Sequence, residues 1–217
     1  MENATKALEM AASVLIGVLI LAALVFGYSQ IAEQKKIEQK NEKAKQLSDY
    51  NINFESYAKD KVYGSELLSL ANEIINYNTR KAVDGYQEIT LEVKINTGVI
   101  DGDFFKSGTY NAKELSYKYI RLSEEIQKAN KSTYGGKSVS YWANTLDPKN
   151  ETEFKNTIKN HKYNIEESDY EKLRREIVAY NKLISEQNDF ARKTFKYNDT
   201  IEYDSGNGKV IKMKFTD

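Results

Sequence analysis

The chain opens with a long run of apolar positions that no charged side chain interrupts. This run extends from Met10 to Tyr28, and Ala7 and Leu8 continue its apolar character toward the N-terminus. A helix needs about 20 such residues to cross the roughly 30 Å hydrocarbon layer of a bilayer. The alternative is a secretory signal peptide, whose apolar region usually has about 7 to 15 residues between a basic start and a small-residue cleavage site. We therefore expect residues 1–30 to form a transmembrane helix that the mature protein keeps.

The pattern changes from apolar to polar over 31–53, but it stays helical. Ala, Glu, Gln and Lys dominate this segment, and it contains neither Pro nor Gly. Oppositely charged residues three positions apart, such as Glu33 with Lys36 and Glu42 with Lys45, predict ion pairs along the helix surface. We expect a polar helical stem here. Because the stem is polar nearly all round, it needs neighbouring chains or a solvated stalk role.

The remainder, 54–217, has the pattern of a compact head domain. Apolar and polar positions alternate over 87–95, which is typical of a strand with one solvent-exposed face. A second alternating segment surrounds the glycine-containing turn at 204–208 and predicts a C-terminal β-hairpin. The three strands can form one small antiparallel sheet.

Apolar residues at spacings of three and four predict several helices in the same domain. Two of these helices begin with a capping pair, Asn111 with Glu114 and Ser168 with Glu171. Helices that follow and precede strands in separate blocks indicate an α+β fold. The expected architecture is a long N-terminal helix, transmembrane in its first half, followed by a globular head of several helices and a small antiparallel sheet that ends in the C-terminal hairpin.

Composition narrows the classes of function. The 217 residues contain 32 Lys and Arg and 32 Asp and Glu, so no net charge favours nucleic acid as a partner. The chain has no Cys and a single histidine, His161, which excludes thiolate zinc sites, cysteine nucleophiles and two-histidine metal sites within one chain. We therefore expect a protein that is not an enzyme and has no cofactor, metal or nucleic-acid partner.

Glu9 is the unusual residue at the start of the apolar segment. An ionised carboxylate deep in a bilayer costs roughly 2.5 to 3.5 kcal/mol on insertion scales, so it usually pairs with a positive group or faces protein. Lys6 lies one turn away and can pair with Glu9 near the membrane interface. The alternative partner is a positive group of another copy, such as its Lys6 or the amine of its Met1. That second contact would make the assembly of copies selective.

One aromatic pair is a candidate contact site of the head. Tyr141 and Trp142 fall within 131–145, where the hydrophobic pattern is weak and a loop is expected. Loops carry recognition residues more often than the regular elements do. The chain's other tyrosines are expected to pack in the core and on the surface.

Two stretches of the chain resemble a known family. Residues 2–25 read ENATKALEMAASVLIGVLILAALV, and 61–80 read KVYGSELLSLANEIINYNTR. Both are similar to the start and the post-stem segment of type IV pilin-like surface proteins of Gram-positive gut bacteria. The resemblance implies an N-terminal helix that packs in a filament core beneath globular heads. It also implies that a carboxylate near the helix start, Glu9 or its rival Glu2, neutralises the N-terminal amine of a neighbouring copy.

The charges beside the apolar segment bear on which side of the membrane the head occupies. Five lysines at positions 35 to 45 follow the segment, whereas Lys6 alone precedes it, and this asymmetry favours a cytoplasmic head. The resemblance implies the opposite side, and interleaved glutamates make the flank nearly neutral. We expect a single-pass membrane protein whose head lies outside, at the cell surface.

Together these patterns predict a structural, pilin-like surface protein that self-associates in the membrane through its N-terminal helix. Glu9, Glu2 and Lys6 are the candidate residues of the assembly contact. Two alternatives stay open: a monomeric single-pass protein whose head binds a ligand or partner, and a membrane scaffold that faces the cytoplasm.

Overall fold

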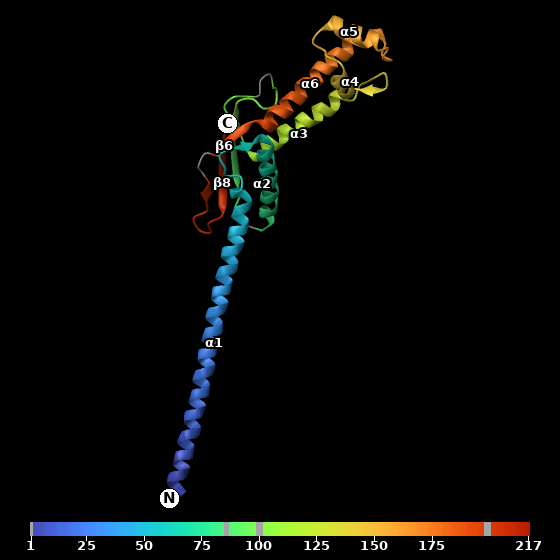
Figure 1. Ribbon diagram of the computed structural model, residues 1–217. Helices are drawn as coiled ribbons and strands as arrows, with labels where there is room; N and C mark the ends of the chain where they lie inside the picture. Colours follow the sequence, from blue (N-terminus) through green and yellow to red (C-terminus); the bar gives the residue numbers. More distant parts are fainter. Residues whose placement is uncertain (1, 85–86, 99–101, 198–200) are drawn as a thin grey trace. The chain divides into compact units, whose positions relative to one another are not determined.

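The computed structural model describes residues 2–84, 87–98, 102–197 and 201–217, and it divides into two compact units, Met1–Ile52 and Asn53–Asp217. The first unit consists of helix α1 (Glu2–Glu55), whose last turn belongs to the second unit. At about 1.5 Å per residue, its 54 residues make a helix of about 80 Å (Figure 1). The helix continues from the apolar stretch into the stem because both segments are rich in strong helix formers.

The second unit, the head, is built on a mixed sheet. The strand order is β1 (Val62–Tyr63), β6 (Thr194–Tyr197), β8 (Val210–Thr216), β2 (Thr90–Ile95) and β3 (Gly108–Tyr110), and β7 (Glu202–Tyr203) also pairs with β8. The antiparallel pair of β7 and β8 is the expected C-terminal hairpin. The α+β fold with a long N-terminal helix is therefore confirmed.

The expectation that the whole sheet is antiparallel is wrong at one pair of strands. β2 and β8 run parallel, with Leu91 opposite Met213 and Val93 opposite Phe215. Only strands joined by a short turn must run antiparallel, and most of the head lies between these two in the chain. Their direction is therefore set by the packing of the head and not by a local turn.

Alternation along the strands places one face of the sheet in the core. Leu91, Val93 and Ile95 of β2 are buried together with Met213 and Phe215 of β8. Two helices, α2 (Gly64–Asp84) and α3 (Ala112–Ala129), contact β2 and each other. The expected solvent-exposed face of β2 is present as well, since its intervening side chains are exposed or half-buried.

One of the two predicted capping pairs is confirmed. At the start of α3, Asn111 Oδ1 accepts the N–H of Glu114 at 2.9 Å, and Glu114 Oε2 accepts the N–H of Asn111 at 3.0 Å. The other is wrong, because a 3-10 turn, η1 (Glu167–Asp169), occupies the place of the predicted cap. Helix α6 (Tyr170–Arg192) begins after this turn without a side-chain cap.

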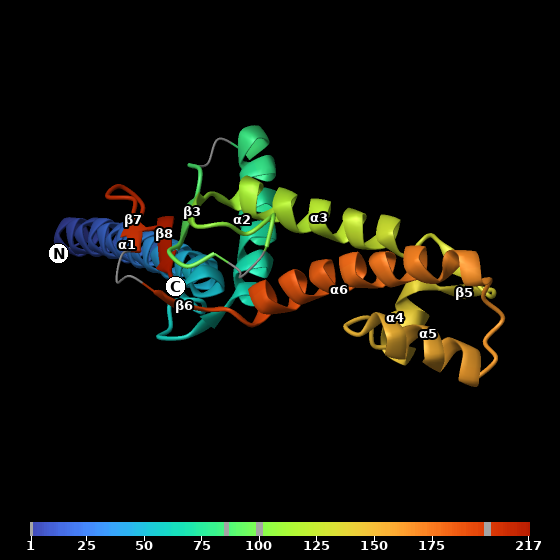
Figure 2. The ribbon, with the colours of Figure 1, turned by 90° about the horizontal axis from the view of Figure 1, so that it is seen from above.

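Helices α3 and α6 run side by side and carry a smaller group of elements at their far end (Figures 1 and 2). We call this group, residues 130–169, the tip. It contains β4 (Thr133–Tyr134), β5 (Lys137–Ser138), α4 (Val139–Thr145), α5 (Glu151–Asn160) and η1. The tip has a hydrophobic core of its own with the first turns of α6, made of Tyr134, Val139, Trp142, Leu146, Phe154, Ile158, Tyr170, Leu173 and Ile177.

The last turn of α1 is fixed to the head by two contacts. Phe54 is 3% exposed, and its ring packs edge-on against Tyr77 of α2 at 6.2 Å between centroids. Tyr203 Oη donates a hydrogen bond of 2.8 Å to Glu55 Oε1. Burial and this carboxylate together raise the pKa of Tyr203 to about 12. The C-terminal hairpin is thus joined to the point where the chain enters the head.

Candidate assembly surface and contact site

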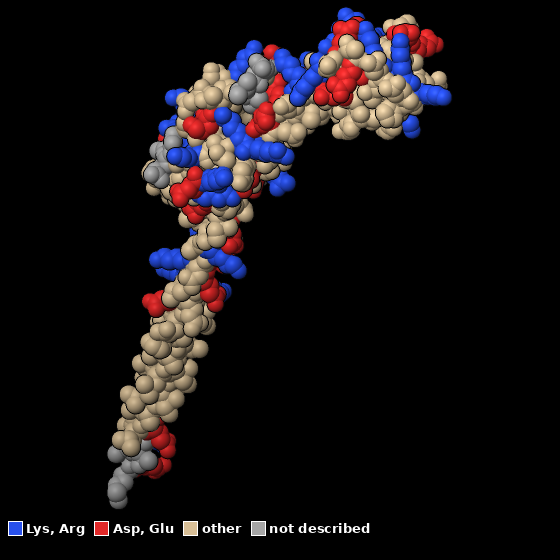
Figure 3. Space-filling view, turned by 45° about the horizontal axis from the view of Figure 1, so that its top comes forward, with Lys and Arg blue, Asp and Glu red and all other residues tan. Residues whose placement is uncertain are grey.

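The apolar stretch of α1 is exposed from end to end. Leu15, Val18 and Phe26 are 64%, 59% and 66% exposed, whereas the head buries large apolar side chains such as Phe105, Phe190 and Phe215 in its own core. Figure 3 shows an uncharged length of this helix between charged side chains at either end. Apolar surface is unfavourable in water by roughly 25 cal/mol per Å², so lipid or other protein is needed to cover it. Among the described residues, α1 is the one helix long and apolar enough to cross a membrane.

Three charged residues lie at the N-terminal end of this stretch. Glu2, Lys6 and Glu9 follow at spacings of four and three, so they share one side of α1. Lys6 Nζ lies 3.6 Å from Glu2 Oε1, and both side chains are exposed. The expected pair of Lys6 with Glu9 is therefore replaced by a pair with Glu2. A glutamate four residues before a lysine is the favoured order on a helix, which accounts for the difference.

Glu9 consequently has no ion-pair partner among the residues that the structure describes. The amine of Met1, the other partner considered from the sequence, lies outside the described residues. The three candidate assembly residues are thus brought together on one exposed face of α1, and the charge of Glu9 is unmatched within the described chain.

The ion pairs expected along the stem do not form. The charged groups of Glu33 and Lys36 do not come within 4.0 Å of each other, and neither do those of Glu42 and Lys45. In the described part of α1, the ion pair that does form joins Lys6 and Glu2. An exposed pair at such spacing contributes only about 0.3 to 0.5 kcal/mol, which the loss of side-chain freedom readily offsets. The charged side chains of the stem therefore point into solvent.

Tyr141 and Trp142 lie in helix α4 and not in a loop, which corrects the expectation from the sequence. Trp142 is 3% exposed, and its Nε1–H donates a hydrogen bond of 2.9 Å to the carbonyl oxygen of Tyr134. The helix has only seven residues, too few to show a helical period in the hydrophobic pattern. Tyr141 is 43% exposed, so of this pair it is the residue whose side chain can contact a partner.

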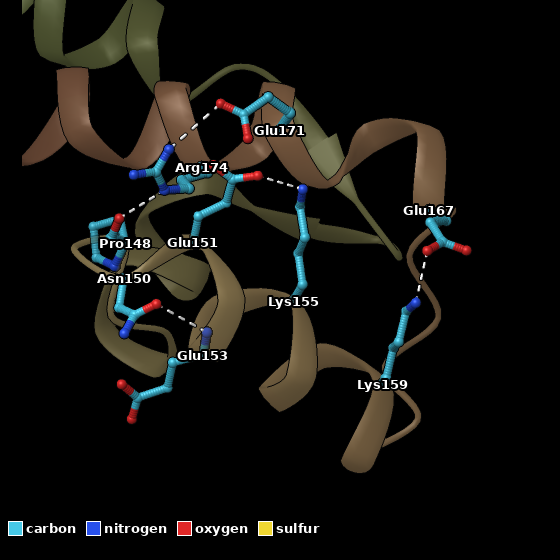
Figure 4. Close-up of polar contacts among 9 residues, drawn as sticks. All are labelled: Pro148, Asn150, Glu151, Glu153, Lys155, Lys159, Glu167, Glu171 and Arg174. Atoms are coloured by element: carbon cyan, nitrogen blue, oxygen red, sulfur yellow. Dashed lines mark hydrogen bonds and ion pairs between the residues drawn. The ribbon is translucent and has the colours of Figure 1, made fainter.

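Polar contacts hold α5 against its neighbours in the tip (Figure 4). Arg174 Nε of α6 donates a hydrogen bond of 2.8 Å to the carbonyl oxygen of Pro148, and Lys159 Nζ lies 2.6 Å from Glu167 Oε1. The hydrogen bond between these last two lowers the pKa of Glu167 and raises the pKa of Lys159. The charges of Lys159 and Glu167 are matched within the tip, and Arg174 joins the tip to α6.

Glu186 of α6 is a buried carboxylate that local sequence patterns do not predict. It is 2% exposed, and it accepts three successive backbone N–H groups, from Asp103 at 2.9 Å, Phe104 at 2.6 Å and Phe105 at 3.0 Å. The one sequence feature that indicates burial of Glu186 is its position four residues before Phe190, which places the two side chains on the same side of the helix. The carboxylate fixes the segment that leads into β3 against α6.

The head also has an open hollow of about 400 Å³ between α2, the start of β2 and the start of α3. Its lining includes Ile75, Asn78, Ile89, Asn111 and Lys113. The amide of Asn78 is already bonded to both backbone groups of Ile89, at 2.9 and 3.0 Å. Within the described parts of the chain, no group of three or more His, Cys, Asp or Glu could hold a metal ion.

No protein-family model, curated protein or solved structure matches this chain in the three comparisons made with it. The pilin-like resemblance of 2–25 and 61–80 thus depends on those residues alone and stays a prediction. The exposed apolar stretch of α1 and the charged residues along this helix are the structural features that bear on function.

Proposed function

We propose that this protein is a non-enzymatic, pilin-like structural protein that a membrane holds by the apolar stretch of α1. In this proposal the copies associate through the same helix, and the head lies at the cell surface. The observation that carries the proposal is the exposure of the large side chains of the apolar stretch in a chain whose head has hydrophobic cores of its own. Such a helix is stable only where lipid or other helices replace water around it.

Glu9 supports the self-association. Its carboxylate lies next to the hydrocarbon-length stretch, and Lys6 is already paired with Glu2. A charge at this depth is stabilised when it meets a positive group on a neighbouring helix. The amine of Met1 of a second copy supplies such a group, and Lys6 of that copy supplies one if it exchanges Glu2 for Glu9.

A second candidate function is a membrane scaffold whose head faces the cytoplasm. The observation in its favour is the excess of lysines after the apolar stretch, with Lys6 alone before it. An amine-reactive reagent that cannot cross membranes separates the two candidates when it is applied to intact cells. Labelling of the exposed Lys35 and Lys36 supports the surface location, and protection that ends on cell lysis supports the cytoplasmic one.

The first test asks whether the helix stays in the membrane. We expect the chain to remain in the membrane fraction after alkaline extraction and to move to the soluble fraction when residues 2–30 are deleted. Mass spectrometry of the mature protein identifies its first residue. A freely soluble product that begins after Tyr28 would show that the apolar stretch is a cleaved signal and would overturn the proposal.

The second test asks whether Glu9 joins copies together. We expect Glu9→Gln to lower self-association of the membrane-embedded chain, measured by chemical cross-linking, and the matched control Glu2→Gln to lower it much less. A loss with Glu2→Gln alone would assign the contact to the rival carboxylate. If both variants associate like the unchanged chain, the charged contact is refuted. If the unchanged chain is monomeric, the self-association is refuted too.

A further inference from the structure

The hollow between α2, β2 and α3 lies along a part of β2 that no described strand covers on one side. β3 pairs with β2 over Val93–Ile95, and this pairing ends where Val93 lies opposite Tyr110. After Tyr110 the chain continues into the cap and first turn of α3. The residues of β2 that precede Val93 are therefore without a described strand on the β3 side, and two of them, Thr90 and Leu91, line the hollow.

Alternation along β2 identifies the backbone groups that face this side. Successive residues of a strand direct their N–H and C=O groups to opposite edges. The carbonyl oxygen of Lys94 faces β8, since it accepts the N–H of Asp217, the residue that follows β8, at 3.3 Å. Val93 therefore faces β3, and Leu91, two residues earlier, directs its N–H and C=O the same way. The side chain of Leu91 is buried, but its backbone borders the hollow.

Asn78 of α2 shows what an amide group does at this edge. Its side chain donates to the carbonyl oxygen of Ile89 at 2.9 Å and accepts the N–H of Ile89 at 3.0 Å. Ile89 and Leu91 are two residues apart, so their backbone groups point to the same edge. Among the described side chains, none pairs with the backbone of Leu91 as Asn78 pairs with Ile89. Leu91 thus offers the same donor and acceptor to a molecule in the hollow.

Two charged residues line the hollow on either side of Leu91. They are Glu88 and Lys113; both are exposed, and neither forms an ion pair with a described residue. Glu88 precedes Leu91 by three residues, which is about 10 Å along a strand. Lys113 belongs to the segment that begins opposite Val93, so it lies toward the other end of the hollow. The unpaired backbone of Leu91 is thus placed between a negative and a positive side chain.

We propose that the hollow binds a short peptide with free ends, about three residues long, as an added strand beside Leu91. Strand addition of this kind takes its affinity from main-chain hydrogen bonds at an unpaired sheet edge. The amino end of the peptide lies at Glu88 and its carboxylate at Lys113, so the peptide runs parallel to β2. An extended tripeptide is about 10 Å long, which matches the span from Glu88 to Leu91.

The parallel direction fixes which peptide groups bond to Leu91. The N–H of Leu91 donates to the carbonyl oxygen of the first peptide residue, and the N–H of the third peptide residue donates to the carbonyl oxygen of Leu91. The backbone groups of the second peptide residue point away from β2. This site lies within the head, and it does not depend on the proposed self-association through α1.

Modified peptides test the backbone contacts one at a time. Tri-alanine is titrated into the detergent-solubilised full chain, and the heat of binding gives a dissociation constant that we expect near about 1 mM for so small a ligand. Methylation of the third peptide nitrogen removes the N–H that donates to Leu91, and it is expected to weaken binding about 10-fold. Methylation of the second peptide nitrogen is the matched control. It is expected to weaken binding much less, because that N–H points away from β2.

Variants of the two charged residues test the direction of the peptide. Lys113→Gln is expected to weaken the binding of tri-alanine about 2- to 5-fold and to leave the affinity for its C-terminal amide unchanged. Glu88→Gln is expected to weaken tri-alanine by a similar factor and to leave the affinity for N-acetyl-tri-alanine unchanged. The matched control is Lys149→Gln, which alters an exposed lysine of the tip and is expected to have no effect. The melting temperature of the head is expected to stay the same in all three variants, because each residue is exposed.

Nuclear magnetic resonance locates the bound peptide. A full chain that carries isotope-labelled nitrogen in its leucines gives an amide signal for Leu91, which is assigned by its absence from Leu91→Ile. Tri-alanine is expected to move this signal downfield, because the amide gains a hydrogen bond. The amide signal of Leu173, in the core of the tip, is expected to stay in place.

Each outcome decides one part of the inference. If tri-alanine does not bind at about 10 mM, or if the Leu91 signal does not move, the peptide site is refuted. If the two methylated peptides bind alike, the pairing with Leu91 is refuted. If Lys113→Gln weakens tri-alanine and its C-terminal amide equally, the assigned direction is refuted. These results leave the association of copies through α1 untouched, since the Glu9 variants test it separately.

Discussion

The replacement of Glu186 by Gln tests how the head holds the segment before β3. The change keeps the shape of the side chain and converts one carboxylate oxygen into an NH₂ group. The amide oxygen can take the place of Oε1 and accept from Phe104 and Phe105, which lie at 2.6 and 3.0 Å. The NH₂ group then faces the N–H of Asp103, which is a donor and loses its acceptor at 2.9 Å.

The size of the effect follows from these contacts. A hydrogen bond to a charged group contributes about 1.5 to 3 kcal/mol, and a buried donor without an acceptor costs about 1 to 3 kcal/mol. The two bonds that are kept become weaker as well, because they no longer involve a full charge. Glu186 is 2% exposed, so water compensates little. We expect Glu186→Gln to lower the free energy of unfolding of the head by about 2 to 4 kcal/mol.

Urea unfolding of the detergent-solubilised full chain measures this change, with fluorescence of the single tryptophan as the signal. At a slope of about 2 kcal/mol per M, the midpoint is expected to fall by about 1 to 2 M. The control is Glu124→Gln, which removes an exposed carboxylate that lies 3.2 Å from Arg121 and is expected to cost less than about 1 kcal/mol. Equal midpoints for the two variants would refute the reasoning.

Three further predictions concern the head. Gly64→Ala is expected to destabilise it by about 1 to 3 kcal/mol, because a Cβ there would clash with the carbonyl oxygen of Phe190; the melting temperature measures this. Trp142→Phe removes the hydrogen bond to Tyr134, and circular dichroism during urea unfolding is expected to show a loss of about 1 to 3 kcal/mol. Burial alone would raise the pKa of Asp217, but backbone N–H groups and a lysine outweigh it and lower that pKa. The stability that Asp217 contributes is therefore present above the pKa of the unfolded chain and lost as pH falls through the lower folded value. Asp217→Asn is expected to make the acid limb of the stability profile shallower.

Matched variants check each of the three. Gly206→Ala adds a methyl group whose nearest neighbour is a side-chain oxygen at 3.3 Å, and we expect it to change the melting temperature little. Tyr141→Phe alters an exposed ring beside Trp142 and is expected to leave stability nearly unchanged. Lys193→Ala removes the ammonium group 2.6 Å from Asp217 and is expected to move the acid limb to higher pH. An unshifted acid limb would contradict the assigned role of that ion pair.

Features of the fold that repeat over neighbouring residues could be predicted from the sequence. The apolar stretch of α1, the alternation in β2 and the Asn111 cap of α3 each depend on residues a few positions apart. The parallel pairing of β2 with β8 could not be predicted, because it joins segments from the two ends of the head and no local pattern sets its direction. The seven residues of α4 are too few to show a helical period, so the sequence pattern predicts a loop around Trp142.

The candidate assembly surface was predictable to a similar degree. Helical spacing alone places Glu2, Lys6 and Glu9 on one side of α1. A carboxylate lies within reach of Lys6 on either side along the helix, and the favoured order of a glutamate four residues before a lysine selects Glu2 over Glu9. The role of Glu186 could not be predicted in this way. Its acceptor function depends on a segment about eighty residues earlier in the chain that folds against α6.

The lengths of the outer strands have a consequence for the assembly proposed above. An unpaired sheet edge is a template on which a strand of another molecule can add, and long, flat edges are the hazardous ones. At the edges of this sheet, β1 and β7 have two residues each and β3 has three. Strands this short offer few unpaired backbone N–H and C=O groups, so an incoming strand can form few hydrogen bonds with them. In the proposed assembly, heads at high local density are therefore expected to collide repeatedly without forming amyloid-like aggregates.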